Sequence, residues 1–247
     1  MASPTERQLS SGYQEFARYA FPPNELGYCG PADSDALMNV GSVDELASRA
    51  REFDGAWPYL GTIADAAGVT DPLDAEVVHN YWVGGPLLAV VDPDALLTRL
   101  RTSFVGQVTG ILDDLEPGEA LAHHSFHVFV VYPWIRFLDR DANKPVQVMQ
   151  DCRVRWGTVE SVDGDHAVIH SRPLTLADGK LLLGAPAPER VRWRRDGASL
   201  APPPVPGQTV SAHWDWVCGA LDDGESDACA TATQASLDIV NAARRRA

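Results

Sequence analysis

The chain has few basic residues for its length. Its 247 residues include 20 lysines and arginines against 34 aspartates and glutamates, so the formal net charge is -14. Nucleic-acid-binding proteins normally present a basic surface. Here the compact basic runs are short and cover residues 190–195 and 244–246. We therefore expect no nucleic acid among the partners of this protein.

Long apolar runs and a recognisable secretory signal are also missing. No apolar run approaches the ~20 residues that span a bilayer, and residues 1–14 lack a basic region followed by an apolar core. Cysteine is scarce, and no CxxC pair occurs among Cys29, Cys152, Cys218 and Cys229. We expect free thiols in a reducing cytoplasm and no membrane association.

Familiar catalytic signatures are absent as well. The sequence contains no glycine-rich phosphate loop, no Ser-His-Asp order and no paired-carboxylate motif that stands out. Its apolar content of 45% is typical of a globular protein, and its length allows one large domain or two ordinary ones.

Helical periodicity dominates the first half of the chain. Apolar residues recur at helical spacing in residues 9–21, where Pro22-Pro23 is expected to end the helix. Further helices are predicted up to residue 53, after Asp71-Pro72, and from Asp92-Pro93 through residue 112. Residues 119–138 are long and do not alternate, which favours a buried helix over a strand.

The pattern changes after a polar segment, residues 139–145, that is expected to be a linker. Beyond it the period falls to two, and turn signals separate short strands predicted at 147–162, 165–174, 180–183, 189–194 and 208–214. A final helix is predicted over about 226–244. The sequence therefore predicts an α+β protein with an N-terminal all-α domain (1–143) and a small OB-like β-barrel with a C-terminal helix (147–247).

One order of motifs in the second half points to a family. Cys152 precedes a strand, an acidic hairpin at Asp163-Gly164 and a return strand. Farther on, a strand led by Pro206-Gly207 ends at His213, and an apolar segment leads into the last helix. This order resembles the HypC/HupF family of hydrogenase maturation chaperones. The whole chain resembles an uncharacterised family of actinobacterial proteins with a helical front and a HypC-like barrel.

The resemblance implies a metal-handling role. In that family, the opening cysteine and the strand-end histidine are implicated in holding an iron fragment that carries cyanide and carbon monoxide, which here correspond to Cys152 and His213. A thiolate and a neutral imidazole both suit iron. The implied partners are a hydrogenase large subunit or a maturation scaffold protein, and the implied role is an assembly chaperone rather than an enzyme.

Neighbouring residues suggest how this pair would work. Arg153 or Arg155 could favour the thiolate form of the cysteine, and Asp215 could orient His213 as a carboxylate partner. We expect Cys152 to open a strand at the mouth of the barrel and to be partly accessible. The alternative is that Cys152 is a buried apolar residue of the core.

A second candidate site lies in the helical half, where His123, His124 and His127 are close in sequence. On a helix, His123 and His127 would share a face, with His124 and His127 as the competing pair. His79 could converge from another helix, and Cys29, in a loop rich in glycine and proline, could add a thiolate. The alternative is that these histidines are hydrogen-bonded in an aromatic core.

Three functions remain open on the sequence. The first is an accessory protein of metallocentre assembly that holds or presents iron through Cys152 and His213. The second is a metal-dependent enzyme that uses the histidines of the helical half, with the barrel as a docking module. The third is an interaction domain that binds no metal.

Overall fold

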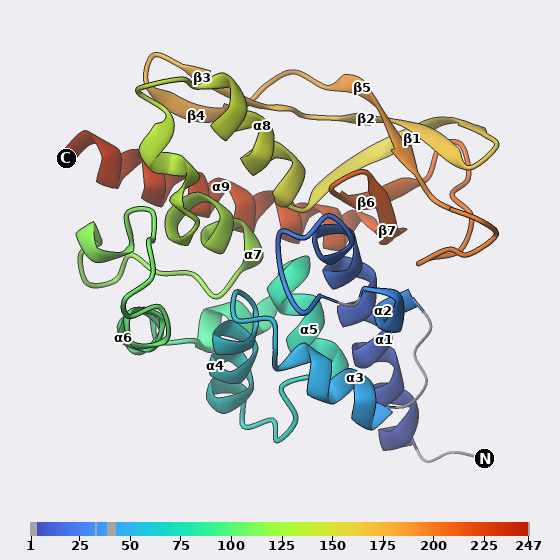
Figure 1. Ribbon diagram of the computed structural model, residues 1–247, viewed down its shortest axis with the longest axis horizontal. Coiled ribbons are helices and arrows are strands. Elements are labelled where there is room, and N and C mark those ends of the chain that lie inside the picture. The colour runs from blue at the N-terminus through green and yellow to red at the C-terminus, as the bar shows by residue number, and fades with distance from the viewer. Residues whose placement is uncertain (1–3, 33, 39–42, 247) are drawn as a thin grey trace.

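The computed structural model describes residues 4–32, 34–38 and 43–246. The first half consists of helices and helical turns (Figure 1). These are α1 (Pro4–Glu25), α2 (Asp35–Met38), α3 (Val43–Ala50), α4 (Trp57–Ala67), α5 (Ala75–Trp82), η1 (Pro86–Val90), α6 (Pro93–Ser103), η2 (Leu112–Asp114), α7 (His124–Phe126), η3 (His127–Val131) and η4 (Pro133–Phe137).

The start of α6 at Asp92-Pro93 was predicted, whereas α5 begins at Ala75 and not at the predicted Asp71-Pro72. The Asp74 carboxylate accepts the Glu76 backbone N–H at the start of α5, and Asp92 caps α6 in the same way with Pro93 directly after it. Two predicted helix lengths were wrong. The α6 helix ends at Ser103 rather than continuing through residue 112, and the segment 119–138 holds only short turns of different winding instead of one helix.

The first helix is longer than predicted. It includes Pro22 and Pro23 in its last turn and ends at Glu25. A proline in a helix lacks the N–H that would bond to the carbonyl four residues earlier. In α1 the carbonyls affected are those of Arg18 and Tyr19, near the end of the helix, so few of its hydrogen bonds are lost.

The second half begins with a helix and not with the expected linker and strand. Helix α8 (Asn143–Cys152) runs through Lys144 and Pro145. The proline lies in the first helical turn, where backbone N–H groups have no helical partner in any case. The elements that follow are β1 (Arg155–Asp163), β2 (His166–Ser171), β3 (Leu174–Ala177), β4 (Lys180–Leu183), β5 (Ala187–Arg192), β6 (Thr209–His213), β7 (Trp216–Ala220) and α9 (Asp223–Arg246).

Five of the strands pair in the closed order β1-β2-β5-β7-β6, because β6 pairs with both β7 and β1. All of these pairings are antiparallel except β5 with β7, which meet at Arg192 and Trp216. Strands β3 and β4 form a separate hairpin. The inward-facing side chains form a small apolar core of Val159, Ala167, Ile169, Val191, Val210, Ala212 and Val217.

The larger core joins the two halves of the chain. It extends from Phe16 in α1 to Ala243 in α9 and includes Cys152, Trp214 and Trp216. Helix α9 runs between the helical half and the strands, and β6 and β7 lie beside α1 (Figure 1). The protein is therefore of the α+β class, and its division into two domains stays a prediction. Within the described residues, no helix is both long and apolar enough to cross a membrane.

A candidate metal centre between the helices and the closed sheet

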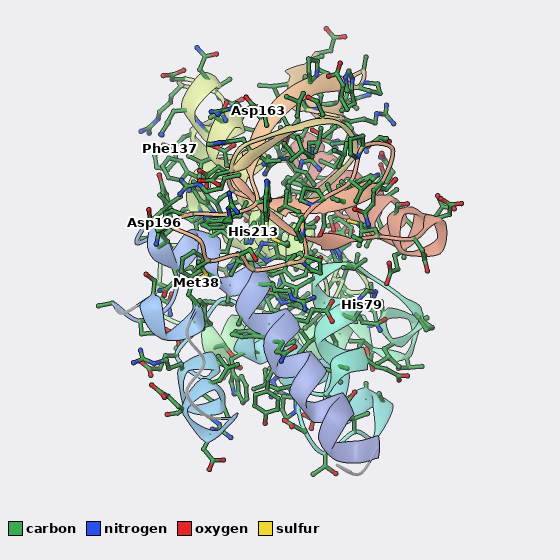
Figure 2. The ribbon with its side chains drawn as sticks, turned by 90° about the vertical axis from the view of Figure 1, so that its right-hand side faces the viewer. Met38, His79, Phe137, Asp163, Asp196 and His213 are labelled. Carbon is green, nitrogen blue, oxygen red and sulfur yellow. The ribbon has the colours of Figure 1, made fainter. Side chains whose placement is uncertain are left out.

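Three buried side chains offer metal-binding atoms at one point of the molecule. The donor atoms of His124, Cys152 and His213 all lie within 4.8 Å of one another. The residues belong to α7, α8 and β6, and they are 6%, 5% and 0% exposed. Figure 2 shows His213 near the middle of the molecule, where the strands meet the helices of the first half.

A tight turn brings Cys152 and His213 together. Trp214 follows His213 in the β6–β7 turn, and its backbone N–H donates to the Asp151 carbonyl at 2.7 Å. Its own carbonyl accepts from the Arg155 guanidinium. Trp214 has a φ of 50°, which is uncommon for a residue other than glycine. The turn thus joins the end of α8 to the end of β6.

The position of Cys152 differs from the prediction in two respects. The residue ends helix α8 instead of opening a strand, and it is buried instead of partly accessible. It also lies outside the interior of the closed sheet. It faces a cavity between the sheet and the helical half, together with residues of α1, α5 and α7.

His213 is oriented by a backbone carbonyl of α1. Its Nδ1–H donates to the Tyr19 carbonyl oxygen at 2.7 Å. That carbonyl is available because Pro23, four residues later, has no N–H to give it. The hydrogen bond leaves the lone pair on Nε2, a buried atom without a hydrogen-bond partner among the described residues. Metal-binding histidines commonly donate their other ring N–H in this way.

His124 is held by the carbonyl of one candidate ligand. Its Nε2–H donates to the Cys152 carbonyl oxygen at 2.8 Å, so its lone pair is on Nδ1, 3.1 Å from the Tyr81 hydroxyl. The same hydroxyl is 3.3 Å from the Gly55 carbonyl. The Tyr81 hydroxyl can therefore turn to Gly55 when Nδ1 of His124 binds a metal.

Burial sets the protonation of these groups. It lowers the pKa of His124 to about 4 and that of His213 well below its ordinary value, so both imidazoles are neutral at pH 7. Burial also raises the pKa of the Cys152 thiol far above its ordinary value. The two neutral imidazoles are ready to bind a metal, whereas the thiol must lose its proton to the incoming cation.

The adjacent arginines do not supply the predicted activation of Cys152. Arg153 is buried and bonds the Gln150 side chain and the Arg172 carbonyl, while Arg155 pairs with Glu189 at 3.0 Å. Arg155 lowers the pKa of Cys152, but this effect is smaller than that of burial. Both guanidinium groups serve to connect α8 to the strands.

The cavity around the three donors is small and mostly apolar. Its volume for the centres of water-sized molecules is about 20 Å³, which is enough for one water or one metal ion. The Trp82 ring closes one side, 4.5 Å from the His124 ring and 5.6 Å from the His213 ring between centroids.

Two other predicted residues line the same cavity. His127, the first residue of η3, is 4% exposed, and its Nδ1 is 3.3 Å from the Tyr59 hydroxyl. Cys29 lies in the loop after α1, which the Asn24 side chain fixes through its bonds to the Cys29 and Pro31 carbonyls. Both residues border the cavity that holds the three donor atoms.

The remaining predicted residues lie elsewhere. His79 bonds Glu15 at 2.8 Å on another part of the molecule (Figure 2), and this hydrogen bond raises its pKa. His123 caps α7, where its Nδ1 accepts the Ser125 N–H. Asp215 pairs with Arg192 and does not orient His213, a task that the Tyr19 carbonyl performs.

The sequence contained a signal for residues that the prediction missed. His79 was expected to converge on the histidine cluster and does not, whereas Tyr81 and Trp82 of the same helix contact the ring of His124. Tyr81 follows His79 by two positions and therefore lies on another face of the helix. The roles of Tyr19 and Pro23 depend on a backbone carbonyl and had no signal in the side-chain pattern.

Comparison with known proteins gives a family for almost the whole chain. A family described as a family of unknown function (DUF6390) matches residues 8–247. The chain belongs to this family. Searches of curated proteins and of solved structures found no match. The chemistry of this DUF6390 member therefore follows from its own residues.

Proposed function

We propose that this protein is an accessory protein of metallocentre assembly that holds one transition-metal ion through His124, Cys152 and His213. The observation that carries the proposal is the convergence of these three donor atoms within 4.8 Å in a buried cavity. Two of the three, Cys152 and His213, are the residues that the HypC/HupF resemblance assigns to iron.

The donor set narrows the choice of ion. Thiolate and imidazole favour soft or borderline transition metals such as iron, cobalt, copper and zinc over magnesium or calcium, which prefer oxygen ligands. The sequence resemblance is the reason for placing iron first among these. Three protein ligands leave a coordination position free, which suits a site that exchanges its ion or its further ligands.

The size of the cavity favours a bare ion. A volume of about 20 Å³ accommodates one ion. An iron fragment that also carries cyanide and carbon monoxide needs more room than this volume offers. The iron is therefore proposed to be bound first without these diatomic ligands.

We also propose a more specific fold, a HypC-like barrel with an N-terminal helical domain, and a partner that receives the metal. The closed strand order supports a HypC-like barrel, and the helices before α8 would form the N-terminal domain that completes the site with His124. A hydrogenase large subunit or a maturation scaffold protein in the cytoplasm would receive the metal.

Metal titration tests this proposal. Protein purified without oxygen and stripped of metal is titrated with cobalt(II), whose thiolate bonds give a charge-transfer absorption. We expect one cobalt ion per chain with this absorption. The Cys152→Ser variant should lose it and bind more weakly by more than the ~10–100-fold that removal of an outer hydrogen-bond partner costs.

Cys229→Ser is the matched control. Cys229 is also fully buried, but it lies in α9 and does not border the cavity. A serine there can bond to the carbonyl four residues earlier, as Ser236 does with Ala232 in the same helix. Wild-type cobalt binding in the Cys152→Ser variant, or its equal loss in Cys229→Ser, would contradict the assignment.

A further inference from the structure

An open cleft adjoins the buried cavity. Its volume is about 320 Å³, and its wall includes Glu52, Asp54, Gln107 and Thr109. Glu52 and Asp54 are exposed, so two carboxylates face solvent near the opening. The cleft therefore presents negative charge to approaching ions.

Four residues border both the cleft and the cavity: Cys29, Gly55, His127 and Tyr132. We call these four residues the partition. A metal ion that reaches the three inner donors from the cleft must pass between them. The inner donors are at most 6% exposed, so an ion in solution has no direct contact with them.

The partition carries metal-binding chemistry on the line of approach. The Nε2 atom of His127 lies against Gly55, where an added Cβ would stand 2.9 Å from it. This nitrogen has no hydrogen-bond partner within the described part of the chain. The Cys29 thiol is a second soft donor that borders the same cleft and cavity. Burial and, after it, the charge of Asp54 raise the pKa of Cys29 to about 11.

Tyr132 and His127 have fixed positions in the partition. The Tyr132 hydroxyl donates to the Tyr28 carbonyl at 3.0 Å, and this bond fixes the loop that carries Cys29 against η3. His127 begins the π-helical turn of η3, a wide winding that often occurs at functional sites. The partition is thus an ordered boundary in which the His127 imidazole lies against Gly55.

We propose that the cleft is the entrance for the metal ion and that Cys29 and His127 form an outer binding station from which the ion passes to His124, Cys152 and His213. This inference rests on the proposed function, since it names the route to the same site. The ligand is a divalent transition-metal ion, and no electron is transferred. Each thiol releases one proton to solvent when it binds the ion, and Cys29 recovers a proton when the ion moves inward.

The rate of cobalt(II) uptake tests the route separately from the affinity. In stopped-flow experiments on the full chain, Cys29→Ser should slow the appearance of the thiolate absorption by about tenfold or more, because the outer station is lost. The equilibrium affinity should stay close to that of the wild type, since the three inner ligands are intact.

Two further variants test whether a slower uptake arises from a change in structure and not from the loss of the route. Asp54→Asn, an exposed substitution, should slow uptake at low salt and match the wild type at high salt, because screening removes the attraction. Gln107→Ala, in the cleft but outside the partition, should leave the rate unchanged.

Uptake by Cys29→Ser at the wild-type rate would overturn the route while leaving the inner site in place. A loss of affinity in Cys29→Ser as large as that in Cys152→Ser would also overturn it, because Cys29 would then be an inner ligand. If the wild-type protein binds no cobalt, the route and the proposed function both fail.

Discussion

Four imidazoles lie in the buried centre of the molecule: His123, His124, His127 and His213. Burial is the main cause that lowers their pKa values, to about 3 for His123 and His127, to about 4 for His124 and well below the ordinary value for His213. In the unfolded chain a histidine has a pKa of about 6.5. Each of these residues therefore binds a proton more readily in the unfolded state.

This difference predicts the pH dependence of stability. Below about pH 6.5 these histidines bind protons in the unfolded state but stay neutral in the folded state. The free energy of unfolding therefore falls as the pH is lowered, by up to about 1.4 kcal/mol per pH unit for each histidine. We expect a loss of several kcal/mol between pH 6.5 and pH 5 in urea unfolding of the metal-free protein. In this interval most carboxylates remain ionised in both states, so the histidines dominate the change.

The variant His124→Gln provides the control. A glutamine does not titrate, so this variant should lose less stability over the same interval, with a slope smaller by about one proton. Stability that does not change between pH 6.5 and pH 5 would show that the imidazoles are not buried as described.

At the scale of single residues, the sequence allowed a partial prediction of the site. It indicated Cys152, His213 and a role for the histidine cluster, but it could not select His124. Two pairs were considered: His124 and His127 border the same cavity, whereas the pair of His123 and His127 assumed a regular helix. His123 instead has an extended backbone before α7, with φ of -130° and ψ of 148°, so it does not share a helical face with His127.

At the scale of elements, α1 and α8 both carry prolines that the sequence pattern suggested would end or exclude a helix. In α8 the apolar positions Pro145, Val148, Met149 and Cys152 follow the spacing of one helical face. The proline and the polar segment before it favoured a linker, and the following strand concealed the helical period. Strands β2, β4, β5 and β6 lie close to the predicted ranges, because turn signals such as Asp163-Gly164 and Asp178-Gly179 separate them, whereas β3 and β7 were not predicted.

The last turn of α1 gives a prediction that belongs to this scale. Pro23→Ala supplies a backbone N–H that can bond the Tyr19 carbonyl, and it then competes with Nδ1 of His213. Helix α1 should remain intact, while cobalt affinity should fall by about tenfold, as for loss of an outer partner of a metal-binding histidine. Equilibrium cobalt titration measures this effect.

Pro22→Ala is the matched substitution. It supplies an N–H toward the Arg18 carbonyl, which is not part of the site, so cobalt affinity should be unchanged. Equal affinities for the two variants would mean that the freed Tyr19 carbonyl does not position His213.

At the scale of the whole molecule, the candidate ligands come from elements far apart in the sequence. His124 lies in the helical half, Cys152 at the end of the helix that connects the halves, and His213 at the end of a strand. The continuous core and helix α9 hold these elements together. A sequence pattern cannot show such a junction, because it depends on how the halves pack and not on local periodicity.

X-ray absorption at the edge of the bound metal tests the central claim most directly, because it identifies the ligand atoms themselves. For the cobalt-loaded protein the account predicts one sulfur at about 2.3 Å and two imidazole nitrogens at about 2.0–2.1 Å, and loss of the sulfur in Cys152→Ser. A shell of oxygen atoms alone, or a sulfur signal that persists in Cys152→Ser, would contradict a metal centre built from His124, Cys152 and His213.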